Sequence, residues 1–485
     1  MSAPSHGNAP EATIRKVLDT CADCDVCRFL MEESCPLFPE LYRLYDREKT
    51  RGAAAGQDEL RRLSERCTLC GLCPCPDIRM DVIRSKAERV RAEGMALGTR
   101  LLADVQRAGQ WGMRAPGIFR RVLSPAPVNR WVKKAMGIHP QRALPSLPHE
   151  SFFAWARRRG LDRKPERGPK VAYFVGCTAG YLFPEVARAA VTVLERRGVA
   201  VFVPPQQCCG MPTLLEGDAR ATLRRMGPNL KVLLKAAKDG FDIVCSCPTC
   251  GFLMKVLLKE GAYYSDAYQR KVEAGEDEIK VPAPRKSAGD AFVRLKKSMY
   301  ETILKDDGCF SDFDALERIA LSETVTDMGE YLGRLDRDQG LNPDTGRPGG
   351  RMVYYAPCHQ RQQGIGSPYL HLLNGIPGSR VEAVGGPLDC CGMGGSLGLK
   401  KDFHDISIGI ASPLIRKIRA AAPEAVVTDC LSCRLQFRHL LPYPVYHPLE
   451  IISSALDHVV GDSEVRVEAH TFLRCSLRRH AGVVG

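Results

Sequence analysis

The sequence lacks several features of secreted, membrane-spanning and nucleotide-binding proteins. No apolar run approaches the roughly 18 residues that a membrane-spanning helix needs. The N-terminal stretch MSAPSHGNAPEATIRKV has no apolar segment, so we expect no secretory signal. No dinucleotide-binding fingerprint is present, and GMGGSLGLKK at 392–401 does not fit the GxxxxGK[ST] pattern of a phosphate-binding loop. We therefore expect a cytoplasmic chain without a nucleotide site of its own, with or without peripheral contact at the inner face of the cell membrane.

Cysteine, in contrast, is abundant: the chain has 21 cysteines in 485 residues. In a protein without an export signal, so many cysteines indicate reduced thiols that bind metal rather than a disulfide scaffold. The hydrophobic content of 44% and the charged content of 26% are ordinary for a globular protein. The length is too great for one hydrophobic core and predicts two to four domains.

Ten of the cysteines form two copies of one frame. The first cysteine frame consists of Cys177, Cys208, Cys209, Cys247 and Cys250. The second cysteine frame consists of Cys358, Cys390, Cys391, Cys430 and Cys433. The copies are offset by 181 residues at the first cysteine, 182 at the adjacent pair and 183 at the last two. So constant a register indicates an internal duplication.

The pattern within each frame favours a metal cluster. Adjacent cysteines rarely bridge one another, because disulfide geometry strains a neighbouring pair. The glycine after each pair, Gly210 or Gly392, lets the backbone approach a bulky group closely. Five thiols from three separated loops suit a cluster bound by thiolates. Buried core cysteines, or a zinc site that uses four of the five thiols, are the alternatives.

Eight further cysteines form two tight groups near the N-terminus. They are Cys21, Cys24, Cys27, Cys35, Cys67, Cys70, Cys73 and Cys75. Each group has the C-x2-C-x2-C…C-P pattern of bacterial ferredoxins, in which the fourth cysteine ligates the other cluster. Applied to this sequence, the ferredoxin arrangement places Cys75 on the cluster of the first triplet and Cys35 on the cluster of the second triplet. The gaps before the fourth cysteines, seven residues and one, depart from the usual three. Zinc is the alternative metal for these cysteines.

The remaining pattern divides the chain into five parts. The sequence predicts an α-helical two-cluster ferredoxin domain over residues 16–95 and a basic linker over residues 96–170. Strands alternate with helices over 171–258 and 347–460, which predicts two parallel α/β domains with cysteines at the carboxyl ends of strands. Residues 259–346 read as a charged, largely helical insertion between them. The predicted fold is therefore multidomain, with a helical ferredoxin domain followed by two duplicated α/β domains.

The linker has an unusual composition. Residues 96–170 contain sixteen Lys and Arg against four Asp and Glu, together with all three tryptophans, Trp111, Trp131 and Trp155. Basic amphipathic segments with interfacial aromatic residues lie on anionic membrane surfaces. The alternative is a basic linker whose tryptophans pack on neighbouring domains. No nucleic-acid-binding motif accompanies the basic residues, so we expect no nucleic-acid partner.

Four single residues carry separate predictions. Cys309 and Cys475 match no frame and are expected to be unligated. Cys245 is interpreted as a buried spectator, with substitution as a ligand as the alternative. His359, next to Cys358, is either a residue that tunes a cluster or an ordinary satisfied polar residue.

The two ferredoxin-like groups followed by two Cys-Cys-Gly frames resemble the heterodisulfide-reductase-related iron–sulfur proteins. APCHQRQQG, CCGMGGSLGLKK, VVTDCLSC and HPLEII carry the resemblance, which covers nearly the whole chain. The C subunit of anaerobic glycerol-3-phosphate dehydrogenase and the D subunit of heterodisulfide reductase are similar. The resemblance implies a CCG domain for each frame, with a noncubane [4Fe-4S] cluster on its five cysteines. It also implies two [4Fe-4S] clusters in the ferredoxin domain.

The resemblance further implies an electron-transfer subunit of an anaerobic oxidoreductase. Electrons would enter from a separate flavoprotein dehydrogenase, similar to glycerol-3-phosphate dehydrogenase, and leave to a quinone or membrane cytochrome. We expect the second frame to be the catalytic one, because His359 adjoins Cys358 and a flexible GMGGSLG loop, followed by Lys400 and Lys401, lies beside the cysteine pair. The alternatives are a heterodisulfide-reductase-type subunit that cleaves a disulfide at a CCG-bound cluster, and a zinc-stapled binding protein.

Overall fold

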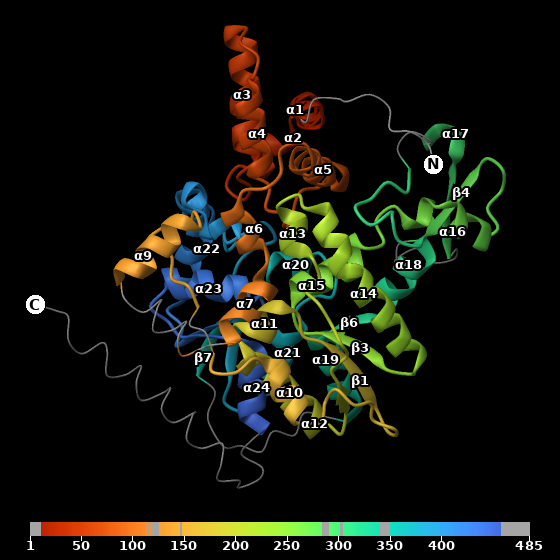
Figure 1. Ribbon diagram of the computed structural model, residues 1–485, viewed down its shortest axis with the longest axis vertical. Helices are drawn as coiled ribbons and strands as arrows, with labels where there is room; N and C mark the ends of the chain where they lie inside the picture. Colours follow the sequence, from red (N-terminus) through yellow and green to blue (C-terminus); the bar gives the residue numbers. More distant parts are fainter. Residues whose placement is uncertain are drawn as a thin grey trace, which may run out of the picture.

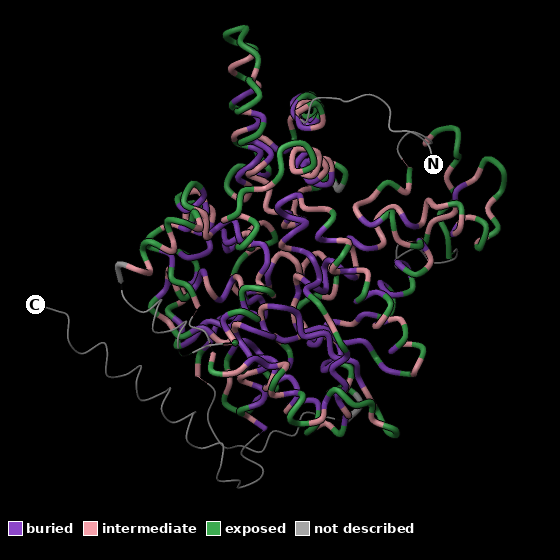
Figure 2. The backbone as a smooth tube through the Cα atoms, in the orientation of Figure 1, coloured by how far each residue is buried: buried purple, intermediate pink, exposed green. Residues whose placement is uncertain are grey.

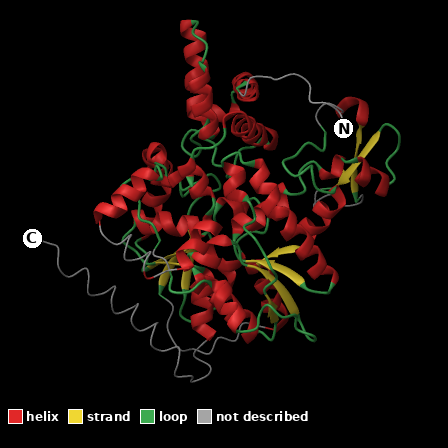
Figure 3. Ribbon diagram, viewed as in Figure 1, coloured by secondary structure: helices red, strands yellow, loops and turns green. Residues whose placement is uncertain are grey.

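The computed structural model describes residues 11–114, 117, 126–145, 148–283, 291–300, 304–339 and 350–456. Figure 1 shows the N-terminal helices projecting from one end of a larger body that contains two sheets. The strands of the two parallel sheets lie in the interior of this body, whereas the far end of α3 is exposed (Figures 2 and 3). Cys475 lies outside the described residues.

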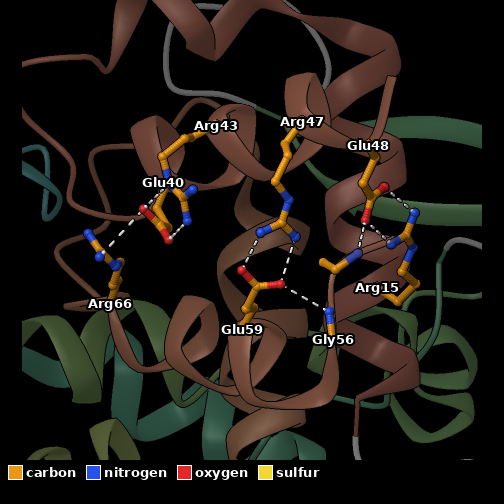
Figure 4. A network of polar contacts seen from close by, with 9 residues as sticks. Arg15, Glu40, Arg43, Arg47, Glu48, Gly56, Glu59 and Arg66 are labelled. Atoms are coloured by element: carbon orange, nitrogen blue, oxygen red, sulfur yellow. Dashed lines mark hydrogen bonds and ion pairs between the residues drawn. The ribbon is translucent and has the colours of Figure 1, made fainter. Parts of the chain in front are cut away.

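The N-terminal part of the described chain is helical. Its helices are α1 (Ala12–Cys24), α2 (Val26–Leu30), α3 (Phe38–Arg51), α4 (Gln57–Glu65) and α5 (Pro76–Glu93). Apolar residues at helical spacing, including Leu18, Leu41 and Leu63, form a buried cluster between them. Two ion pairs join the outer faces: Arg47 Nη2 lies 2.6 Å from Glu59 Oε2, and Arg15 Nη1 lies 2.6 Å from Glu48 Oε1 (Figure 4). Packing and ion pairs together fix α1, α3 and α4 relative to one another.

The first sheet is parallel, with strand order β2-β1-β3-β6. Its strands are β1 (Lys170–Phe174), β2 (Ala200–Phe202), β3 (Asp242–Cys245) and β6 (Val325–Asp327). The connecting helices are α11 (Cys177–Tyr181), α12 (Pro184–Arg196), α13 (Met211–Leu215), α14 (Ala219–Lys238), α15 (Pro248–Phe252), α18 (Ala315–Thr324) and α19 (Met328–Gln339). Strands β1 and β3 are almost entirely buried, as expected for a parallel sheet covered on both faces.

The second sheet repeats this arrangement, with strand order β10-β9-β7-β8 and all pairings parallel. Its strands are β7 (Arg351–Tyr354), β8 (Arg380–Ala383), β9 (Ala425–Val427) and β10 (Val445–Tyr446). Its helices are α20 (Cys358–Arg361), α21 (Pro368–Asn374), α22 (His404–Ala421), α23 (Leu431–Leu440) and α24 (Pro448–Leu456). Helix α12 packs against α24, and one buried apolar cluster contains residues of both sheets. The duplication in sequence is therefore a duplication in topology.

The predicted boundary between the first α/β domain and the insertion differs from the structure. Strand β6 pairs with β3, so the first sheet continues well beyond residue 258. The segment 259–346 is also not uniformly helical, because β4 (Glu278–Pro282) and β5 (Phe292–Lys296) form an antiparallel pair. Within 259–346, α16 (Asp266–Lys271), α17 (Lys297–Tyr300) and the two-stranded pair have no counterpart between β9 and β10 of the second sheet.

The basic linker forms helices that lie beside both α/β domains. They are α6 (Leu97–Ala103), α7 (Val105–Arg114), α9 (Ala126–Ala135) and α10 (Phe152–Arg158). Helix α7 packs against α11. Gly109 has no side chain, and this lets the Tyr181 side chain approach the backbone of α7 closely. Trp155 packs on the core, whereas Trp111 and Trp131 are 62% and 69% exposed. No described helix is long and apolar enough to span a membrane.

Candidate functional site

The first cysteine frame assembles at the carboxyl ends of three strands. Cys177 begins α11 after β1, the Cys208-Cys209 pair follows β2, and Cys247 precedes α15 after β3. The Sγ atoms of Cys177 and Cys208 are 3.4 Å apart, and those of Cys209 and Cys250 are 3.3 Å apart. Parallel strands bring their carboxyl ends to one edge of a sheet, which explains why residues so far apart in sequence meet.

The second cysteine frame has the same placement on the second sheet. Cys358 begins α20 after β7, the Cys390-Cys391 pair follows β8, and Cys430 precedes α23 after β9. The Sγ atoms of Cys391 and Cys433 are 3.0 Å apart. The structure thus brings together thiols from all three loops in each frame, as the duplication predicted.

The glycine after each pair has a backbone conformation that other residues rarely adopt. Gly210 has φ +96° and Gly392 has φ +76°. A Cβ atom at Gly392 would lie 2.0 Å from the carbonyl oxygen of Ser407. The pair can therefore turn toward the other cysteines only if glycine follows it.

The eight N-terminal cysteines separate into two groups in space. Burial raises the pKa of Cys21 to about 12, and the neighbouring thiols of Cys27, Cys75 and Cys24 contribute to this rise. The second group contains Cys35, Cys67, Cys70 and Cys73. Burial raises the pKa of Cys35, with Cys70 and Cys67 as its charged neighbours. Burial likewise raises the pKa of Cys73 to about 12, with Cys67 and Cys70 beside it. In each group the fourth cysteine is the one that follows the other triplet in sequence: Cys75 joins the first group and Cys35 the second.

In the part of the chain that the structure describes, there is no group of three or more His, Cys, Asp or Glu side chains that could hold a single metal ion. A cuboidal cluster differs from a single ion, because its irons occupy separate corners and each takes its own thiolate. Grouped thiols without a common point of convergence therefore fit a cluster better than a single ion.

His359 joins three parts of the protein at one point. Its Nε2 lies 2.9 Å from the carbonyl oxygen of Leu69, and its Nδ1 lies 3.0 Å from Thr249 Oγ1. The ring also stacks on Phe252, with the centroids 4.7 Å apart. Burial lowers the pKa of His359, so the ring is neutral and has both nitrogens engaged. These contacts agree with the interpretation of His359 as a satisfied polar residue. They do not agree with a role of His359 as a free proton donor.

Lys86 is a second junction, and no motif in the sequence pointed to it. Its Nζ donates hydrogen bonds to the carbonyl oxygens of Cys67, at 2.9 Å, and Leu215, at 3.1 Å. The residue is buried, and burial lowers the pKa of its ammonium group. It therefore ties the second N-terminal cysteine group to α13, the helix that follows the first cysteine pair, through backbone acceptors, which a sequence pattern does not reveal.

The loop after the second cysteine pair is packed, whereas the sequence suggested a flexible loop. Ser396 Oγ donates to Glu216 Oε1 at 2.8 Å, and Lys400 Nζ lies 2.6 Å from Glu216 Oε2. A Cβ atom at Gly394 would lie 2.7 Å from Thr68. The loop thus contacts both the first α/β domain and the N-terminal part, and the Lys400 charge is paired.

The two described cysteines that belong neither to a frame nor to an N-terminal group differ in burial. Cys245 ends β3, is fully buried, and its Sγ lies 3.5 Å from the carbonyl oxygen of Cys247. Cys309 is partly buried, and burial raises its pKa to about 12. Both remain predicted spectators.

Comparison with known proteins agrees with this geometry. The model of the cysteine-rich CCG domain matches residues 171–255 and 352–438. The C subunit of anaerobic glycerol-3-phosphate dehydrogenase from Escherichia coli is 22% identical over 378 residues, 78% of this chain and 81% of that protein. The B subunit of fumarate reductase (CoM/CoB) from Methanothermobacter marburgensis is 24% identical over 56% of this chain and 42% of its own length. Lactate utilization protein A from Exiguobacterium is 24% identical over 59% of this chain and 98% of its own length.

These matches confirm the resemblance that the sequence motifs suggested. The two matched regions each contain one complete cysteine frame and most of one parallel sheet. The chain therefore contains two copies of the CCG cysteine-rich domain and is homologous to the C subunit of anaerobic glycerol-3-phosphate dehydrogenase and to iron–sulfur proteins of the heterodisulfide reductase type.

Proposed function

We propose that this protein is an electron-transfer subunit that holds four iron–sulfur clusters. Its relatives include subunits of anaerobic oxidoreductases, which supports an iron–sulfur subunit in general. The observation that carries the particular proposal is the proximity of the second N-terminal cysteine group to the second frame. Burial, followed by the neighbouring charge of Cys70, raises the pKa of Cys358, and Cys70 also acts on Cys390.

Two [4Fe-4S] clusters would occupy the N-terminal part. One would be held by Cys21, Cys24, Cys27 and Cys75, and the other by Cys35, Cys67, Cys70 and Cys73. The spatial grouping supports this exchange of fourth ligands, which is the ferredoxin arrangement. When bound, these clusters supply one-electron carriers, and the protein supplies the thiolates and their spacing.

Each cysteine frame would hold one further cluster. The resemblance to heterodisulfide reductase implies that this cluster is of the noncubane type. The ligands would be Cys177, Cys208, Cys209, Cys247 and Cys250 in the first frame. Those in the second would be Cys358, Cys390, Cys391, Cys430 and Cys433. The buried positions of the paired cysteines and the forced turn at Gly210 and Gly392 support this assignment.

The order of electron transfer follows from these positions. The outer group with Cys21 would receive electrons, and the inner group with Cys70 would pass them to the second frame. The loop beside Cys390 is packed, so it does not provide an open path by which a substrate could reach the second frame. We therefore assign the second frame an internal relay role instead of the catalytic role that the sequence suggested.

The partners are proposed from the relatives and from the surface. A flavoprotein dehydrogenase would donate electrons, since the relative in Escherichia coli is one subunit of a dehydrogenase. A quinone or membrane cytochrome would accept them. The exposed side chains of Trp111, Trp131 and Leu97 lie on the helices of the basic linker and support peripheral contact with an anionic membrane.

The relay is tested with two single variants of the iron-loaded protein, Cys391→Ala and Cys209→Ala. Each is reduced with an artificial donor, and the reduction of a quinone is followed. If the second frame relays electrons, Cys391→Ala abolishes quinone reduction while the N-terminal clusters are still reduced. Undiminished quinone reduction by Cys391→Ala would overturn the relay.

A further inference from the structure

A basic cleft lies beside the first cysteine frame. It has a volume of about 820 Å³ and is bounded by residues of α5, α6, α7, α13 and the first turns of α14. Its charged lining is dominated by the arginines Arg91, Arg100, Arg107, Arg220, Arg224 and Arg225. We call this feature the basic cleft.

The acidic residues of the basic cleft do not neutralise these arginines. Asp104 and Asp218 are its acidic lining residues. Asp104 Oδ2 lies 2.6 Å from Arg225 Nη2, so it compensates the charge of that arginine. Asp218 Oδ1 accepts a hydrogen bond from the backbone nitrogen of Ala221 at 2.9 Å and caps α14. The cleft therefore keeps a substantial positive charge.

Four arginines of the cleft remain available to a ligand. Arg91, Arg100, Arg220 and Arg224 are exposed, and none of them forms an ion pair with another described residue. A guanidinium group presents a planar fork of donors that matches carboxylate and phosphate oxygens. Several such groups around one concave space favour a ligand with more than one anionic group.

One side of the basic cleft reaches the first cysteine frame. Gln106, a lining residue, accepts a hydrogen bond on Oε1 from the backbone nitrogen of Cys208 at 2.7 Å. The guanidinium of Arg225 is near enough to Cys208 and Cys177 to interact electrostatically with both thiols. A molecule bound in the cleft would thus lie against the residues that position the first cysteine pair.

We propose that the basic cleft binds a small soluble molecule carrying two or more carboxylate or phosphate groups. The volume lies within the range of about 300–1,000 Å³ that is usual for small-molecule sites. A concave space bounded by five helices fits a compact anion better than it fits the flat surface of a bilayer. This site is separate from the cluster ligands and does not depend on the direction of electron flow.

The test uses the iron-loaded full chain and two soluble probes, tricarballylate and pyrophosphate, in isothermal titration calorimetry. The variant Arg220→Gln/Arg224→Gln removes two exposed guanidinium groups and leaves the Asp104–Arg225 pair intact. The matched control, Arg270→Gln/Arg337→Gln, removes the same charge from exposed helical positions on α16 and α19, which do not line the cleft. Iron content and circular dichroism confirm that both variants fold like the parent protein.

We expect saturable binding of tricarballylate, of pyrophosphate, or of both, and the stronger probe identifies carboxylate or phosphate as the preferred group. The cleft variant should bind about tenfold more weakly or not at all, because charge-assisted contacts are lost, whereas the control should bind like the parent. Absence of saturable binding by both probes overturns the proposal. Equal weakening in the control variant overturns it as well. Binding only to phosphatidylglycerol vesicles would overturn it too, by assigning the arginines to a lipid surface.

Discussion

The Nε2 atom of His359 lies 2.9 Å from the carbonyl oxygen of Leu69, a residue between two cysteines of the second N-terminal group. The same ring reaches Thr249, which lies between two cysteines of the first frame, while His359 itself follows Cys358 of the second. One partly buried imidazole therefore connects three cysteine sites. A side chain with two ring nitrogens at fixed positions can hold these loops in register, because both hydrogen bonds are directional.

Replacing this ring should loosen the junction. We expect His359→Ala to lower the free energy of unfolding by about 1–3 kcal/mol, because it leaves buried polar partners unsatisfied. It should also slow electron transfer from the N-terminal clusters to the second frame, as measured by rapid-mixing spectroscopy. His371→Ala, at an 80% exposed side chain, is the control and should change neither quantity. Wild-type stability and transfer rates in His359→Ala would show that this junction contributes to neither.

The two N-terminal cysteine groups should respond differently to mutation. Cys24→Ser, at an exposed cysteine of the outer group, should remove one cluster and leave the spectra of the CCG clusters unchanged. Cys70→Ser should remove the inner cluster and also alter the spectrum of the second frame, because Cys70 is a charged neighbour of Cys358. Both α/β domains should stay folded, since their sheets are built from separate residues. Iron analysis and electron paramagnetic resonance measure these outcomes, and identical effects of the two variants would contradict the relay order.

Glu260 should make stability depend on pH. Burial raises the pKa of its carboxyl group to about 7, and its Oε2 has no hydrogen-bond partner among the described residues. The unfolded chain has an ordinary glutamate pKa of about 4.3, so between about pH 4.3 and 7 only the unfolded state releases the proton. Stability from this residue should therefore fall as pH rises through that window, by up to about 3 kcal/mol.

The corresponding variant is Glu260→Gln, which keeps the shape and cannot ionise. Its thermal midpoint should be higher than that of the parent at about pH 7.5, and the two should converge near about pH 4.5. Equal slopes of midpoint against pH in both proteins would show that Glu260 is not the responsible group.

Membrane contact should depend on both charge and tryptophan. Each basic residue near an anionic surface contributes roughly 1 kcal/mol, and salt screens this attraction over a Debye length of about 8–10 Å. Binding to phosphatidylglycerol vesicles should therefore weaken steeply with salt. Trp111→Ala/Trp131→Ala should weaken it by about tenfold or more, because large apolar rings are lost from the contact. Phe29→Ala, at a 76% exposed residue of α2, serves as the control. Salt-independent binding, or no binding, would leave the basic segment as a linker.

The cysteine frames and the parallel sheets could be predicted from sequence because their signals are local and repeated. Buried strands such as VAYF and MVYY precede cysteines at constant offsets, and strand ends in a parallel sheet meet at one edge. Strand β6 was missed because VTD is short and lacks an apolar run, and its partner β3 is distant in sequence.

The contacts between the parts could not be predicted in the same way. His359 and Lys86 bond to backbone carbonyls of Leu69, Cys67 and Leu215, and a carbonyl carries no residue-specific signal. The loop after Cys391 was interpreted as flexible from its glycines. Gly394 and Gly395 are needed there for positive φ and for close packing.

The most direct test of the proposed electron relay is metal analysis of the anaerobically purified protein combined with reductive titration. We expect about sixteen irons per chain, a similar amount of acid-labile sulfide, and brown visible absorbance that dithionite bleaches. Zinc in place of iron, no labile sulfide and no bleaching would contradict the proposal that these cysteines hold electron-carrying clusters.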